Sequence, residues 1–250
     1  MGWFVIASLL VVTACGAELG GTGQATPDAS GGGGDGGVNV DAAIDALAVP
    51  TCANGRVIYL NFDGVTLTQG TSDATQNRAG WLQAATATAP AYRVGQMNRQ
   101  ADIAQVTAGI RAQLASFPIT VVTARPATGQ YVMIVFGGTA AQVASAFGGA
   151  VNRLDCGDVQ RNDVAWISDG VTPSQLVVNY AVGAIGFGLG LTATTVPTDC
   201  MCGWDNQCTP VSTGPCTLTD NIPRDPAANQ LCAGLTTQSE TLAFTQAFCQ

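Results

Sequence analysis

One stretch of the sequence constrains the fold more than any other. Residues 174–189, SQLVVNYAVGAIGFGL, are apolar nearly all round. A helix with no polar face must be buried, so the rest of the chain has to supply layers that cover it. Thr172 and Pro173 precede the stretch as a predicted N-cap and first helical residue. The sequence therefore predicts a buried helix from Ser174 to about Leu189.

Other segments alternate between strand and helix patterns. Residues 99–117 carry apolar side chains at intervals of three and four, which predicts a helix with one apolar stripe. Short runs rich in β-branched and aromatic residues predict strands, and the wholly apolar run among them, 131–136, predicts a strand buried on both faces. The predicted strands cover residues 56–62, 119–123, 131–136 and 163–168. This order favours a single α/β (α+β sandwich) domain.

The basic residues exclude much chemistry. The chain has 9 basic residues, all of them arginine, 17 acidic residues, and no histidine. A Ser-His-Asp or Cys-His catalytic unit and an imidazole zinc site are therefore excluded. The net charge of -8 and the absence of a basic cluster argue against nucleic acid as a partner.

The first fifty residues are expected to lie outside the folded domain. Residues 1–14 have the short apolar core of a secretory signal. Val12-Thr13-Ala14-Cys15 resembles the lipobox of bacterial lipoproteins, which implies cleavage before Cys15 and its acylation. A plain signal peptide with an incidental cysteine is the alternative. Residues 15–50, rich in Gly, Ala and Asp, are predicted to be a flexible linker. The expected location is the bacterial cell envelope, as an outer-membrane lipoprotein whose lipid anchor is its contact with the membrane.

The remaining cysteines are even in number and six of them lie in the last 51 residues. In an exported chain this pattern predicts four disulfides, with 105 possible pairings, and a disulfide-rich C-terminal region. A zinc site made by the thiolates of Cys200, Cys202, Cys208 and Cys216 is the alternative. The disulfide candidates are Cys52, Cys156, Cys200, Cys202, Cys208, Cys216, Cys232 and Cys249.

The buried helix carries a family resemblance. Residues 179–193 read NYAVGAIGFGLGLTA, and Met201 follows shortly after. This segment resembles the helix of metzincin-type zinc metalloproteases, in which HExxHxxGxxH is followed by a methionine turn. Aligned on Gly190, the three zinc-binding histidines and the general-base glutamate of the family fall on Gly183, Phe187, Ala193 and Ala184. Met201 falls on the methionine turn.

The resemblance spans roughly residues 55–205 and includes bacterial secreted members, through RVIYLNFDG at 56–64 and the segments 152–157 and 162–165. It implies a metzincin-like domain over 51–200, with a mixed twisted sheet, a long helix and a buried former active-site helix. The Met-turn and a disulfide-rich subdomain would follow over 201–250. It also implies a peptide cleft along an edge strand near Gly149–Leu154.

The departure from the family motif decides the expected activity. None of the four motif positions carries a donor atom or a carboxylate, so both the metal and the base that activates water would be missing. The resemblance therefore implies a pseudoprotease without a zinc cofactor, acting in binding or scaffolding, with a peptide or protein in the vestigial cleft. The glycines of the helix also fit close packing by another segment.

Two other functions remain open. One is a hydrolase that uses a mechanism without histidine, based on carboxylates. The other is a structural envelope protein with no ligand site. An acidic patch, Asp155, Asp158, Asn162 and Asp163, can be read as a calcium site or as solvated loop acids.

Overall fold

The structure, a computed structural model, describes residues 56–204, 208 and 213–249. The predictions for residues 1–50, for Cys15 and for Cys52 lie outside the described residues. All the described residues fall in one compact unit, which includes those of the predicted C-terminal subdomain. None of the helices in this part of the chain is both long enough and apolar enough to cross a bilayer.

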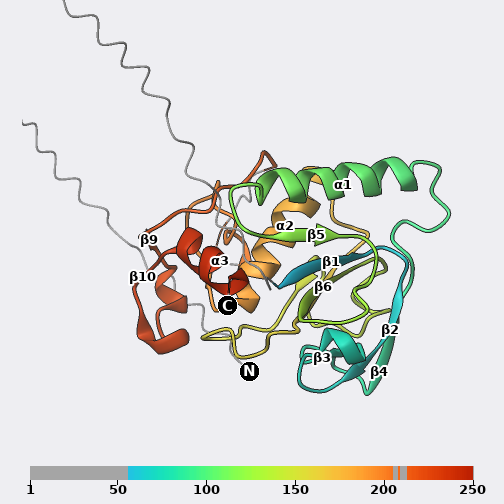
Figure 1. Cartoon of the computed structure of the whole chain (residues 1–250), viewed down its shortest axis with the longest axis horizontal. Helices are drawn as coiled ribbons and strands as arrows, with labels where there is room; N and C mark the ends of the chain where they lie inside the picture. Colours follow the sequence, from blue (N-terminus) through green and yellow to red (C-terminus); the bar gives the residue numbers. More distant parts are fainter. Residues whose placement is uncertain (1–55, 205–207, 209–212, 250) are drawn as a thin grey trace, which may run out of the picture. The chain divides into compact units, whose positions relative to one another are not determined.

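A mixed five-stranded sheet forms the centre of the unit (Figure 1). Its order is β5-β1-β6-β8-β7, with β7 antiparallel to β8 and the other neighbours parallel. The strands are β1 (Val57–Asn61), β5 (Thr120–Val122), β6 (Tyr131–Phe136), β7 (Ala150–Val151) and β8 (Val164–Ile167). The predicted strands therefore match β1, β5, β6 and β8, and β7 is an addition at one edge.

Alternate residues of each central strand face two different cores. Ile58 and Leu60 of β1 point into the core shared with the helices, whereas Tyr59 points into the core on the other face. The apolar run of β6 is buried at every position, as expected for a strand covered on both faces.

Two helices cover one face of the sheet and pack on each other (Figure 1). They are α1 (Arg99–Gln113) and α2 (Ser174–Gly188). The predicted helix reaches Phe117, but α1 ends at Gln113. Phe117 is still buried, and its ring centroid lies 5.4 Å from that of Phe244.

The start of α2 differs from the prediction. Its N-cap is Pro173, with no side-chain capping bond, and not Thr172. Pro173 has φ −74° and ψ 177°, which is extended backbone, so it precedes the helix and leaves Thr172 too far from the first turn to cap it.

A small three-stranded sheet covers the other face. Its order is β3-β2-β4, and the strands are β2 (Val65–Gln69), β3 (Arg78–Ala79) and β4 (Thr86–Ala89), with η1 (Ala74–Gln76) between β2 and β3. Leu67, Ala79 and Ala89 bury their side chains against this face of the central sheet. The sequence did not predict this layer.

The last part of the chain packs as short elements beside α2. They are β9 (Ile222–Pro223), η3 (Pro226–Ala228), η4 (Cys232–Gly234), β10 (Thr237–Gln238) and α3 (Glu240–Phe248). The disulfide Cys156–Cys232 ties η4 to the loop between β7 and β8, Cys200–Cys216 and Cys202–Cys208 lie in the segment before β9, and Cys249 is also disulfide-bonded. The prediction of disulfides is confirmed. The four cysteines of the alternative zinc site are paired with each other as two disulfides, so that alternative is wrong.

Candidate binding cleft

The motif positions on α2 face the segment that contains Met201. A Cβ atom at Gly183 would overlap Nε1 of Trp204, and a Cβ at Gly186 would lie 2.6 Å from Sδ of Met201. The ring of Phe187 stacks on Trp204 at 5.1 Å between centroids, with an angle of 26° between the planes. The place of a side chain at position 183 is thus taken by the indole of Trp204.

The segment after α2 turns back on the helix at Gly190. This glycine has φ +87°, and a Cβ there would lie 3.0 Å from the carbonyl oxygen of Asp155. Ala193 is fully buried in the same hydrophobic core as Met201, and its carbonyl accepts a hydrogen bond from the N–H of Asp225 at 2.8 Å. Ala184 is buried too, and its carbonyl accepts from Nδ2 of Asn152.

The structure therefore brings Gly183 and Phe187 together at Trp204, and Met201 lies against the neighbouring Gly186. Ala184 and Ala193 contribute only main-chain hydrogen bonds and apolar surface. Among the described residues there is no group of three or more acidic or cysteine residues able to hold a metal ion.

A cleft of about 250 Å³ opens beside Phe187 and Trp204. The described residues of its walls carry no charged side chain, and Tyr180 of α2 contributes a hydroxyl. Burial raises the pKa of Tyr180, so this hydroxyl stays protonated and can donate a hydrogen bond at neutral pH. The cleft is lined by Ala146, Phe147, Gly148, Gly149, Ala150, Val151, Asn152, Tyr180, Phe187, Gly203 and Trp204.

Strand β7 forms one side of this cleft and is the edge of the central sheet. The N–H of Ser168 donates to the carbonyl of Gly149 at 2.8 Å, so these two residues form a hydrogen-bonded pair. Bonded and non-bonded pairs alternate in an antiparallel ladder, and Ala150 opposite Ile167 is the next pair. The N–H and C=O of Ala150 consequently point away from β8, toward the open edge.

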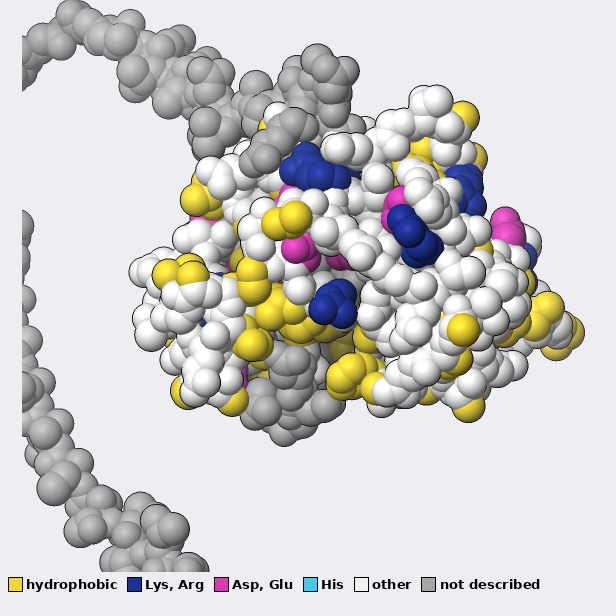
Figure 2. All heavy atoms as spheres, turned by 90° about the horizontal axis from the view of Figure 1, so that it is seen from below, with side chains coloured by type: hydrophobic (Ala, Val, Ile, Leu, Met, Phe, Trp, Pro, Cys, Tyr) yellow, Lys and Arg dark blue, Asp and Glu magenta, His cyan; other side chains and the backbone are white. Residues whose placement is uncertain are grey.

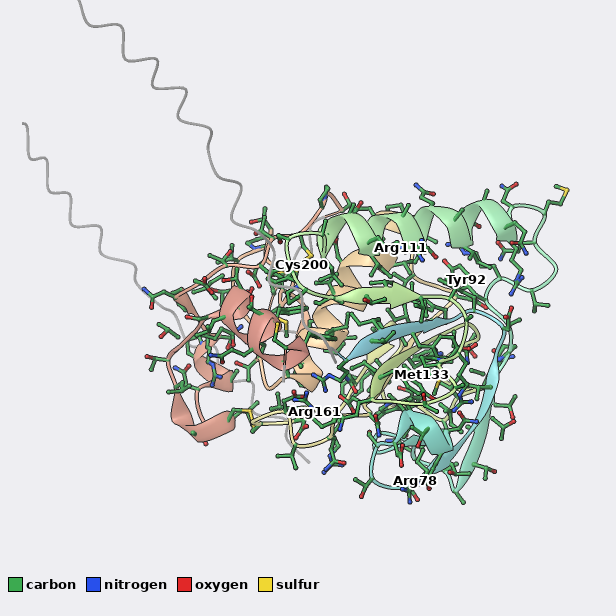
Figure 3. All side chains as sticks on the ribbon, in the orientation of Figure 1. Arg78, Tyr92, Arg111, Met133, Arg161 and Cys200 are labelled. Carbon is green, nitrogen blue, oxygen red and sulfur yellow. A yellow bond between two sulfur atoms is a disulfide. The ribbon has the colours of Figure 1, made fainter. Side chains whose placement is uncertain are left out.

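The opposite edge of the sheet is covered. Arg111 of α1 donates from Nε and Nη2 to the carbonyl of Val121 in β5, at 3.3 and 3.0 Å (Figure 3). A charged side chain that caps an edge strand hinders pairing with another chain. Of the two edges, β7 is therefore the one available to a further strand.

Charged side chains are also sparse elsewhere on the surface. Only 10% of the residues are charged. On the face in Figure 2, charged side chains are few, some arginines lie beside acidic residues, and hydrophobic side chains gather in a band across the middle. The neutral cleft is in keeping with this surface.

A second cavity, of about 370 Å³, lies between the β2–β3 region and the loop before β8. Asp163 lines it and is almost fully buried; burial raises its pKa to about 7, and hydrogen bonds from Asn152, Val164 and Ser72 oppose this rise. Asn152 donates one hydrogen bond to the carboxylate of Asp163 and another to the carbonyl of Ala184. Asp163, next to β8, is therefore connected through Asn152 to α2.

The acidic patch predicted from the sequence is divided by the fold. Asp155 and Asp163 line the second cavity, whereas Asp158 forms ion pairs with Arg56 and Arg161 at 2.7 and 2.9 Å. The carboxylate of Asp158 is thus occupied by arginines and is not directed at a shared calcium ion with the other two.

Several cleft residues were missed by sequence reasoning. Trp204, Tyr180 and Phe147 stand in no motif, and Ala150 matters through its backbone and not its side chain. The one signal that pointed here was the edge strand implied by the family resemblance near Gly149–Leu154, a range that contains β7.

The comparisons with known proteins add no family. The chain matches no protein-family model, and none of the curated proteins matches it.

Proposed function

We propose that this protein is a non-catalytic, metzincin-like lipoprotein of the cell envelope that binds an extended peptide or protein segment in its cleft. The observation that carries the proposal is the open edge of β7 beside a neutral, aromatic cleft. A purely structural protein has no need of such an open edge, because exposed edges invite unwanted pairing.

Strand addition supplies the binding contact. The outward N–H and C=O of Ala150 can each form a main-chain hydrogen bond with an extended segment laid along β7. This mode of recognition requires no metal ion and no nucleophile. It therefore remains possible in a chain whose motif positions lack ligands and base.

A selection from a library of random linear peptides tests the binding function. We expect the selection to yield peptides that bind the purified protein, and Ala150→Pro to abolish their binding because proline removes the outward N–H. An edge position whose N–H faces solvent tolerates proline, so the variant should fold. Ala150→Ser, which keeps the N–H, is the matched control. Equal binding by wild type and Ala150→Pro, with both folded by circular dichroism, would contradict strand addition.

The kinship with metalloproteases is tested by restoring the ligands. Wild-type protein should contain no stoichiometric zinc by elemental analysis. In a variant with Gly183→His, Phe187→His and Ala193→His, Trp204→Ala removes the indole, and the segment at Cys200 must also shift, because its carbonyl oxygen lies 2.5 Å from a Cβ at position 183. The folded variant should bind about one zinc per chain, as three imidazoles complete a zinc site. Zinc in the wild type, or none in the folded variant, would count against the metzincin-like assignment.

The lipid anchor is tested separately. Cells that express the full chain with a labelled fatty acid should incorporate the label into this protein, and Cys15→Ser should remove it. Label that persists in the variant would show that Cys15 is not the acylated residue.

A hydrolase with a carboxylate base is the second candidate, and one observation favours it. The hydroxyl of Ser72 lowers the pKa of Asp163 through a hydrogen bond, and both line the second cavity. With a pKa of about 7, Asp163 could accept the Ser72 proton as the serine oxygen attacks an ester carbonyl, and then return it to the leaving alkoxide. Water would release the acyl group by the same route. A screen of peptide, ester and glycan substrates in which no turnover is lost in Asp163→Asn would retire this candidate.

A further inference from the structure

We propose that the cleft is a specificity pocket for one aromatic side chain of the segment that pairs with β7. The inference rests on the proposed function, since β7 must first hold the main chain of the ligand. It adds the chemical class of side chain that the protein selects.

Aromatic rings from three separate parts of the chain converge on the cleft. Phe187 and Tyr180 come from α2, Trp204 follows Met201, and Phe147 precedes β7. Phe187 and Trp204 are only 8% and 7% exposed and stack on each other, so they form a fixed wall. Phe147 lines the cleft and is 48% exposed, so part of its side chain is open to solvent.

The remaining wall is made of backbone. A Cβ atom at Gly149 would lie 3.3 Å from Cε2 of Tyr180, so the glycine lets the tyrosine ring pack against the chain just before β7. Near Gly148 no other atom lies within 4 Å of a Cβ position, and the pocket is open at that side. A side chain that projects from a strand on β7 can therefore enter between these walls.

The size of the cleft fits a single side chain. Its volume of about 250 Å³ lies below the range of about 300–1,000 Å³ that is usual for cofactors and drug-sized ligands. Ring–ring contacts with Phe147, Phe187 and Trp204 favour a phenyl or phenol group over an aliphatic group of similar volume. The hydroxyl of Tyr180 can also donate a hydrogen bond to a carbonyl of the peptide.

The same walls disfavour a charged side chain. None of the described lining residues is charged, so an ammonium or carboxylate group would lose its hydration without gaining an ion pair from them. The pocket thus favours aromatic side chains through ring contacts and disfavours charged side chains through the loss of their hydration.

The experiment uses a series of blocked peptides, acetyl-Ser-Thr-X-Thr-Ser-amide, in which X is Phe, Leu, Ala, Lys or Glu. Their dissociation constants are measured by calorimetry with the folded protein. We expect the Phe peptide to bind about tenfold more tightly than the Ala peptide, with Leu between them and the two charged peptides weakest.

A matched pair of protein variants assigns the preference to the pocket. Phe147→Ala should reduce the preference for Phe over Ala to about threefold or less. Leu242→Ala removes an exposed apolar side chain of α3, outside the cleft and 52% exposed, and should leave the preference intact. Both residues are exposed, so neither variant should impair folding.

The outcomes separate this inference from the function on which it rests. If all five peptides bind equally and Ala150→Pro abolishes their binding, the aromatic pocket is overturned and strand addition stands. A preference for Phe that Phe147→Ala leaves unchanged also overturns the pocket. If neither these peptides nor a random library yields any binder, both the proposed function and the inference fail.

Discussion

At the scale of single residues, hydrogen bonds and ion pairs of arginine side chains join the two ends of the described chain. Arg56, just before β1, forms a two-bond contact with Asp158 at 2.7 and 2.9 Å, and its guanidinium lies 4.9 Å from the ring centroid of Phe248 in α3. Arg161 bonds to the same carboxylate and to the carbonyl of Ala247 (Figure 3). Burial raises the pKa of Asp158, and the two arginines oppose this rise.

Arg56→Ala should lower the free energy of unfolding by about 3 kcal/mol, because it leaves a buried carboxylate with one arginine in place of two. Urea denaturation at neutral pH measures this loss. Arg78→Ala is the control: its ion pair with Asp73 has side chains that are 39% and 18% exposed, so the loss should be at most about 1 kcal/mol. Equal losses in the two variants would contradict a special role of the buried pair.

A second residue-scale feature is a pair of buried carboxyl groups beneath Met201. Oδ1 of Asp199 accepts from the N–H of Met201 at 2.8 Å, and its Oδ2 is buried. Glu240 is fully buried, and burial is the largest cause that raises its pKa. The nearby Asp199 raises it further, to about 8. No arginine in the described part of the chain forms an ion pair with either group. Glu240 therefore keeps its proton and shares it with Asp199.

This pair makes stability depend on pH with a defined sign. Glu240 titrates near 4.5 when unfolded and near 8 when folded, so between these values the folded protein binds more protons. Its contribution to the free energy of unfolding therefore falls as pH rises from about 4.5 to about 8. Glu240→Gln should flatten this fall, measured by urea denaturation across the window. A variant with the same slope as wild type would contradict the shared proton.

At the scale of elements, α2 depends on glycine for close packing. Three glycines of α2 lie so close to other side chains that a Cβ would overlap them. This close approach is why a helix with few large residues is still well packed. The glycines are Gly183, Gly186 and Gly188. The interpretation of these glycines as close-packing positions, left open by the sequence, accounts for the contacts with Trp204 and Met201.

Gly183→Ala should lower the free energy of unfolding by about 1–2 kcal/mol, because overlap with the Trp204 indole exceeds the gain of about 1 kcal/mol in helix propensity. Gly148→Ala, where a Cβ meets nothing within 4 Å, should be close to neutral. Thermal and urea unfolding measure both. In a double-mutant cycle, Trp204→Ala should reduce the penalty at position 183 but not remove it, because the carbonyl oxygen of Cys200 also lies 2.5 Å from a Cβ there. A penalty of the same size with and without the indole would contradict its role.

At the scale of the whole molecule, disulfides secure the C-terminal elements against the sheet and α2. Cys156–Cys232 joins residues 76 apart in sequence, whereas Cys202–Cys208 joins residues 6 apart. A cross-link over a longer loop restricts the unfolded chain more.

Replacing Cys156 and Cys232 together by serine should cost about 4 kcal/mol, and replacing Cys202 and Cys208 together about 2 kcal/mol. Urea midpoints of the two double variants give the comparison. The reverse order would indicate that the short loop stabilises the folded cleft directly and not only through the entropy of the unfolded chain.

Local sequence pattern was enough for part of this fold. The apolar runs of β1, β6, β8 and α2 predict that these elements are buried, because an element covered on all sides needs apolar residues at every position. The same reasoning failed for the sheet β2–β4, whose strands are short and rich in Thr and Ala, and for the edge strand β7, which has only two residues.

The sequence by itself determined that no imidazole chemistry is possible, that α2 is buried and that disulfides cross-link the C-terminal region. Only the tertiary structure decided what fills the space beside Gly183. Trp204 lies 21 residues further along the chain, and its approach depends on the turn at Gly190, on the seating of Met201 and on two disulfides. A local pattern specifies which positions are buried, but which distant side chain covers them follows from the path of the chain between.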